Sequence, residues 1–243
     1  MGQADDQEGT TLQRLCVYAI RCVKAETNAS LFPEICGSWG LQNPMATECG
    51  LKRVKDTTFT FAADGGVVTV PIGLVRHTEL AVRLRHAENM EEDLARYTFL
   101  DYGEGEVDVR ARLPRAGYFL LRVFASHPHL AGLQHAADFL LHADTPCKDC
   151  LPFPYSSDFA HANRTRLLQP LVREVSRGMS YLFRVQAPRL TRLRVNGRKM
   201  ERGFDGVWEA EVIPEHEGKT VLISGSAQRE ATYLSGLYTF DVV

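Results

Sequence analysis

The sequence predicts an all-β protein made of two tandem β-sandwich domains, preceded by a short N-terminal segment that is helical or disordered. Three observations predict this fold. Apolar and polar residues alternate with a period of two in many short runs after residue 57, turn residues separate these runs, and the second half repeats the pattern of the first. The 243 residues, 44% of them hydrophobic and 24% charged, are enough for two ordinary domains with buried cores.

Residues 1–36 are expected to lie outside both sandwiches. Residues 1–10 are polar and acidic, and residues 10–26 space apolar side chains about one helical turn apart, which predicts a short amphipathic helix. The N-terminus lacks the basic and then apolar pattern of a secretory signal, and no run approaches the roughly 20 apolar residues that span a bilayer. We therefore expect a cytoplasmic protein without a membrane span.

The first sandwich is predicted over residues 37–146. Its seven alternating runs are 57–62, 67–73, 79–85, 96–101, 106–113, 117–125 and 137–143. In the fifth run, Val107, Val109, Ala111 and Leu113 are expected to face the core, with charged residues between them. About seven short strands in about 100 residues are typical of an immunoglobulin-like sandwich.

The second sandwich is predicted over residues 147–243. Its strands are expected at 179–187, 190–195, 198–202, 207–213, 219–227 and 233–243. Asn196-Gly197 predicts a tight hairpin, because a type I′ turn needs positive φ at both central residues. A shift of 101 residues places Gly105 on Gly206 and Gly117 on Gly218 and keeps the core-facing positions in phase, which indicates two copies of one sandwich joined near residue 146.

No catalytic residue or cofactor is predicted. The phosphate-binding, dinucleotide, zincin and nucleophile-elbow motifs are absent from the sequence. Cys49 lacks the glycine-rich or aromatic context of a catalytic thiol, so we interpret it as a small buried residue or a linker residue. His135 and Asp138 are three residues apart in a strand, so we expect them on opposite faces and unable to act as a pair.

The six cysteines are thinly spread, which indicates reduced thiols rather than a disulfide framework. Cys147-Lys-Asp-Cys150 has the spacing of half a zinc site, but no second pair of ligands follows it, so we expect two free thiols and no metal. The formal net charge of −2 gives no indication of a nucleic-acid partner.

A basic ribbon surrounds the predicted Asn196-Gly197 hairpin, and it is the candidate partner-binding site. Its members are Arg189, Arg192, Arg194, Arg198, Lys199 and Arg202. Arginine forks pair well with carboxylates, so the ribbon could bind an acidic segment of a protein partner. The alternative is that these charges only keep a sheet edge soluble.

Several segments, taken in their order along the chain, resemble the sequences of one known family. They are WGLQNPMATECGL (39–51), VVTVPIGL, ELAVRLRHA, RYTFLDYGEGEVDVRARLPRAGYFLLRVFA, HAADFLLHA and CKDCLPFP. Together they resemble the C-terminal region of the kyphoscoliosis peptidase and hillarin family, over about residues 37–243 and better in the first domain. In that family a transglutaminase-like cysteine peptidase domain precedes immunoglobulin-like domains.

This resemblance implies an intracellular, cytoskeleton-associated protein with a filamin- or septin-type partner. No residue matches the family's Cys-His-Asp triad, which lies in a domain that this chain does not contain. We therefore expect a non-catalytic interaction or scaffold module. The alternatives are an accessory, substrate-binding part of a transglutaminase-like peptidase whose catalytic domain is missing here, and an extracellular ligand-binding sandwich.

Overall fold

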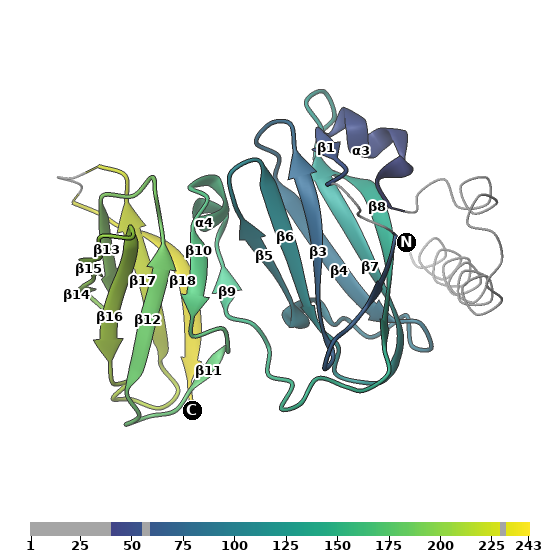
Figure 1. Ribbon diagram of the computed structural model, residues 1–243. Helices are drawn as coiled ribbons and strands as arrows, with labels where there is room; N and C mark the ends of the chain where they lie inside the picture. The colour runs from purple at the N-terminus through teal and green to yellow at the C-terminus, as the bar shows by residue number, and fades with distance from the viewer. Residues whose placement is uncertain (1–39, 55–58, 229–231) are drawn as a thin grey trace. The chain divides into compact units, whose positions relative to one another are not determined.

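The computed structural model describes residues 40–54, 59–228 and 232–243 (Figure 1). The helix predicted within residues 10–26 lies outside the described residues, as do Cys16, Cys22 and Cys36. The described chain is mostly β and divides into two compact units. The first combines the residues up to Thr98 with Val109–Cys150, and the second combines Phe99–Asp108 with Leu151–Val243.

The first sandwich begins with a 3-10 turn, η2 (Gly40–Gln42), and a short helix, α3 (Pro44–Glu48). One sheet has the order β1-β3-β6-β5 and the other the order β2-β8-β7-β4. A further 3-10 turn, η3 (Ala95–Tyr97), leads into β5. The strands are β1 (Leu51–Lys52), β2 (Thr60–Ala62), β3 (Val67–Leu74), β4 (Leu80–His86), β5 (Thr98–Tyr102), β6 (Glu106–Arg112), β7 (Gly117–Ser126) and β8 (Leu133–Ala143).

The predicted core positions of β6 are confirmed. Val107, Val109, Ala111 and Leu113 are all fully buried. On β7, Phe119 and Leu121 are also fully buried, and the strand begins at Gly117 with φ of 119°. A Cβ atom at Gly117 would lie 2.9 Å from His86 Nε2, so both the backbone angle and the packing favour glycine there.

The second sandwich repeats the strand order of the first and adds β9 and β14. Its sheets run β10-β12-β16-β15 and β11-β18-β17-β13-β14, and β9 also pairs with β18. A short helix, α4 (Asp158–Ala162), follows β9. The strands are β9 (Tyr155–Ser156), β10 (Arg166–Gln169), β11 (Glu174–Val175), β12 (Tyr181–Gln186), β13 (Arg192–Val195), β14 (Arg198–Lys199), β15 (Glu201–Arg202), β16 (Val207–Val212), β17 (Thr220–Ser226) and β18 (Ser235–Val242).

In each sandwich, two short strands near the start of the domain occupy equivalent places in the two sheets. β1 is antiparallel to β3 while β2 is parallel to β8, and β10 is antiparallel to β12 while β11 is parallel to β18. The strands matched by the shift of 101 residues, β6 with β16, β7 with β17 and β8 with β18, hold equivalent places in the two sandwiches. The predicted pair of immunoglobulin-like sandwiches is therefore confirmed.

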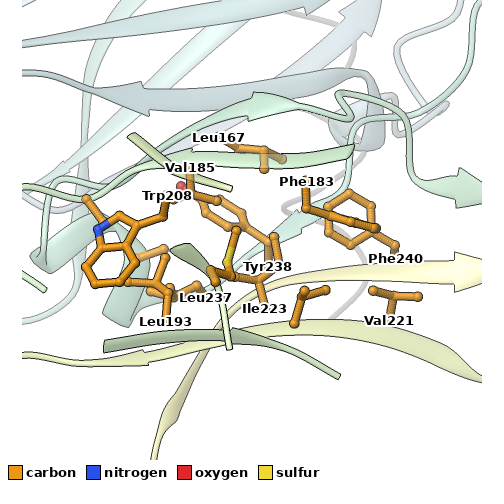
Figure 2. Packing of buried hydrophobic residues seen from close by; sticks show 14 of the residues in the cluster. Leu167, Phe183, Val185, Leu193, Trp208, Val221, Ile223, Leu237, Tyr238 and Phe240 are labelled. Carbon is orange, nitrogen blue, oxygen red and sulfur yellow. The ribbon is translucent and has the colours of Figure 1, made fainter. Parts of the chain in front are cut away.

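Side chains from both sheets fill the core of the second unit (Figure 2). Phe183 of β12 packs edge-on against Phe240 of β18, with ring centroids 5.2 Å apart. The buried Tyr238 hydroxyl donates to the Thr165 carbonyl over 2.9 Å and contacts the Thr165 hydroxyl at 2.8 Å. Burial raises the pKa of Tyr238 well above its usual value, so it is a neutral hydrogen-bonding group inside the core.

Several short elements differ from the prediction. The alternating pattern did not predict α3, α4, β1 or β9–β11, because elements of two to five residues are too short to show a period. The predicted strand 198–202 is two strands in different sheets, since Met200 between β14 and β15 is fully buried and marks the change of sheet. Near the predicted junction at residue 146, the first unit extends to Cys150.

Candidate partner-binding groove

A groove lies at one edge of the second sandwich, beside the predicted hairpin. Its volume is about 510 Å³. It is bordered by β13, by the chain from β14 to β15, and by Trp208 of β16. The lining residues are Thr191, Arg192, Leu193, Arg194, Lys199, Met200, Glu201, Arg202 and Trp208.

The hairpin between β13 and β14 holds the basic residues in place. Asn196 and Gly197 have φ angles of 47° and 80°, as the predicted turn requires. The Asn196 side chain accepts a hydrogen bond from the Leu222 backbone N–H at 2.8 Å, and the Asn196 N–H donates to the Leu222 carbonyl at 2.9 Å. The turn is therefore tied to the neighbouring strand β17.

Three of the cations at the groove are open to solvent. Arg194, Lys199 and Arg202 are exposed, and Lys199 Nζ lies 3.5 Å from the equally exposed Glu201 carboxylate. Such a surface ion pair is worth at most about 1 kcal/mol. The Arg202 guanidinium lies 5.6 Å from the centroid of the Trp208 ring, within cation–π range.

Two members of the predicted ribbon lie elsewhere. Arg198 donates to the Glu211 carbonyl at 2.7 Å and lines a different pocket of about 650 Å³. Arg189 is 3.9 Å from the Glu104 carboxylate and donates to the Ala162 carbonyl at 3.5 Å. The structure thus brings Arg192, Arg194, Lys199 and Arg202 together at one groove and separates Arg189 and Arg198 from it.

The sequence did not single out two aromatic residues at this edge. Trp208 is 6% exposed, and its indole Nε1 is buried without a hydrogen-bond partner. Figure 2 shows its ring at one end of the packed cluster. Phe204 is fully exposed in the loop from β15 to β16, where Gly203 and Asp205 each bond the backbone of Val207. An unpaired buried donor and an aromatic ring held in solvent are both unusual enough to call for an explanation.

The expectation that His135 and Asp138 lie on opposite faces is wrong. His135 Nε2 lies 3.0 Å from Asp138 Oδ1, and Arg122 Nε donates to the same oxygen at 2.9 Å. The reason is a β-bulge: Val123 pairs with Ala137 and Phe124 with His135, so Ala136 is an extra residue that reverses the alternation. His135 and Asp138 therefore lie on one side of the sheet, where Asp138 bonds both His135 and Arg122.

The three described cysteines are free thiols. Burial is the main cause that raises the pKa of Cys49, and its Sγ contacts the Ala125 carbonyl at 3.7 Å. These features suit a packed core residue more than a nucleophile. Within the described ranges no group of three or more His, Cys, Asp or Glu side chains could hold a metal ion, and no helix is both long and apolar enough to cross a membrane.

The topology defines the chain as a tandem of immunoglobulin-like sandwiches. Residues 39–154 match the family model of the KY-like, immunoglobulin-like domain. The first sandwich is therefore a KY-like immunoglobulin-like domain, in agreement with the resemblance that the sequence motifs indicate. No curated protein sequence matches the chain significantly.

Solved structures also match this chain, and three of them are given as examples. Fibronectin(III)-like modules of Clostridium thermocellum CbhA share 9% identity, with 79% of this chain and 94% of that chain covered and a TM-score of 0.23. An E-to-A variant of titin domains I67–I69 shares 12% identity, with coverage of 75% and 62% and a TM-score of 0.22. The titin tandem A164-A165 shares 9% identity, with coverage of 75% and 90% and a TM-score of 0.23. With TM-scores this low, we base no functional conclusion on them.

Proposed function

We propose that the chain is a non-catalytic, intracellular protein-interaction module, and that its second sandwich binds an extended acidic segment of a cytoskeletal protein in the groove between β13 and β16. One observation carries this proposal: Arg192, Arg194, Lys199 and Arg202 surround a groove that Trp208 also lines. Carboxylates on a partner complement these cations in charge and in geometry.

The short strands at this edge favour recognition through side chains. β14 and β15 contain two residues each, and in the described chain β14 pairs with β13 and β15 with β16. Two-residue edges offer too few backbone groups for a long added strand. The affinity therefore comes mainly from charge pairing, with Phe204 available as an exposed apolar anchor in the loop that follows Arg202.

The cytoskeletal setting of the proposal rests on the family. The KY-like match over residues 39–154 supports the motif resemblance. That resemblance implies a cytoskeleton-associated protein. The groove lies outside the matched residues, so its acidic ligand is argued from charge alone.

A labelled peptide of alternating glutamate and valine is a direct probe of the groove. We expect the full chain to bind it in a fluorescence anisotropy titration, and to bind more weakly as salt is added. The double variant Arg194→Glu/Lys199→Glu should weaken binding by roughly tenfold or more, because two attractions become repulsions.

The matched control is Arg177→Glu, which makes the same charge reversal at an exposed arginine that does not line the groove. It should bind like the parent chain, and a lysine–valine peptide should not bind. Equal affinity of the parent and the double variant would show that these cations only protect a sheet edge.

A further inference from the structure

Cys147 and Cys150 lie at the two ends of a tight turn that closes the first unit. Lys148 and Asp149 form the turn, and Asp149 has a positive φ of 48°. Both cysteine side chains leave this one turn, and the Cys147 thiol donates to the Lys148 carbonyl at 3.6 Å. The first and fourth residues of a β-turn have Cα atoms less than about 7 Å apart, a separation that a disulfide can bridge.

The fold fixes the position of this turn. The Cys147 backbone N–H donates to the Leu113 carbonyl at 2.8 Å, and the Leu113 N–H donates to the Gly66 carbonyl at 2.7 Å. A Cβ atom at Gly66 would lie 2.0 Å from the Cys147 nitrogen, so the backbone of residue 147 is packed directly on this glycine. Cys147 is thus held on the edge of the sandwich, while both thiols keep part of their surface accessible.

The surroundings of Cys150 favour its protonated thiol. Burial, followed by the neighbouring Cys147 sulfur, raises the pKa of Cys150 to about 11. Cys150 therefore keeps its proton at neutral pH. The Arg112 guanidinium is close enough for its charge to act on both sulfurs, and a nearby cation stabilises a thiolate.

We propose that Cys147 and Cys150 form a thiol–disulfide exchange site that accepts small disulfides of the glutathione type and closes reversibly into an intramolecular disulfide. The Cys147 thiolate attacks one sulfur of the small disulfide, forms a mixed disulfide and expels one thiolate. Cys150 then loses its proton to solvent, attacks Cys147 Sγ and expels the second thiolate. The two protein thiols lose two electrons and two protons in total, and the small disulfide gains them to become two thiols.

The test uses the full chain in glutathione buffers of increasing oxidised fraction. After an acid quench and alkylation of the remaining thiols, peptide mapping should locate a bond between Cys147 and Cys150 that dithiothreitol removes. Cys150→Ser should instead accumulate a glutathione adduct on Cys147, because no second thiol can release it. Arg112→Gln should slow formation of the bond by roughly fivefold.

Two comparisons make the outcome decisive. Arg110→Gln removes the same charge from the same strand and should leave the rate unchanged. The bond should also form faster in the folded chain than in the chain unfolded by urea, since only folding brings Arg112 to the sulfurs. Full alkylation of both cysteines after oxidation, or equal rates in the folded and unfolded chains, would overturn the proposal.

Discussion

Two buried carboxylates show how single residues are stabilised in this protein. Asp138 accepts from Arg122 Nε at 2.9 Å and Nη2 at 3.4 Å, and Asp101 accepts from Arg166 Nε at 2.9 Å and Nη2 at 3.2 Å. Both aspartates are less than 5% exposed. A forked arginine matches a carboxylate in geometry as well as in charge, which offsets part of the cost of burial.

The Asp138 carboxylate makes the stability of the first unit depend on pH. Burial raises the pKa of Asp138, but hydrogen bonds from His135 and Arg122 more than offset this effect, so the pKa lies below its usual value. A folded-state pKa below the unfolded-state value of about 3.9 means that the ionised carboxylate stabilises the fold above that pH. This stabilisation is lost as the pH falls through the folded-state pKa.

We therefore expect Asp138→Asn to lower the free energy of unfolding by about 2 kcal/mol at pH 7, with a smaller loss near pH 3. Urea titrations at both pH values measure the difference. Asp144→Asn is the control, because the Asp144 side chain is 92% exposed. A loss of equal size at both pH values would contradict a role for the ionised carboxylate.

At the scale of elements, the sequence predicted the features that depend only on residues adjacent in the chain. The Asn196-Gly197 turn was predictable, because these two residue types adopt positive φ without help from the rest of the fold. The bulge at Ala136 was not predictable, because it depends on the pairing of β8 with β7. For the same reason, the basic residues were found in the sequence, but their division between the groove and other surfaces was not.

The hairpin gives a prediction for the element that carries the groove. Asn196→Ala removes the acceptor for the Leu222 N–H and places a residue less tolerant of positive φ in the turn. We expect it to cost the second unit about 1–2 kcal/mol of unfolding free energy. The measurement is a urea titration followed by a signal specific to the second unit.

Two further substitutions separate the effect of the lost hydrogen-bond acceptor from the effect of the positive φ angle. Asn196→Asp keeps an acceptor and should retain most of the stability, and Asn196→Gly keeps the φ angle without the acceptor and should lie between Asp and Ala. If all three variants matched the parent chain, the hydrogen bond to Leu222 would contribute nothing to the hairpin.

At the scale of the whole molecule, the internal repeat could be seen in the sequence. The unit to which the hairpin between β5 and β6 belongs could not. Phe99–Asp108, which contains all of β5 except Thr98 and the start of β6, belongs to the second unit. Within that unit the Phe99 ring lies 5.5 Å from the Phe153 ring and 6.2 Å from the Tyr238 ring, measured between centroids. Alternation shows that residues 96–101 form a strand, but it does not show which core their side chains join.

This grouping predicts that residues 151–243 alone form an incomplete domain. Without Phe99–Asp108, the core loses the 3% exposed Phe99 and Arg166 loses its carboxylate partner Asp101. We expect the isolated fragment to be about 3–5 kcal/mol less stable than the same residues in the full chain, from the cavity and the broken ion pair together. Hydrogen exchange of β10 and β12 in the fragment and in the full chain measures this difference.

Two substitutions in the full chain test the same grouping without truncation. Phe99→Ala should increase exchange in β12 and β18 of the second unit, at a cost of about 3 kcal/mol. Phe119→Ala removes an equally large buried ring from the first unit and should leave exchange in those strands unchanged. A fragment as well protected as the full chain, together with a Phe99→Ala variant that affects only the first unit, would show that the second sandwich folds without the hairpin.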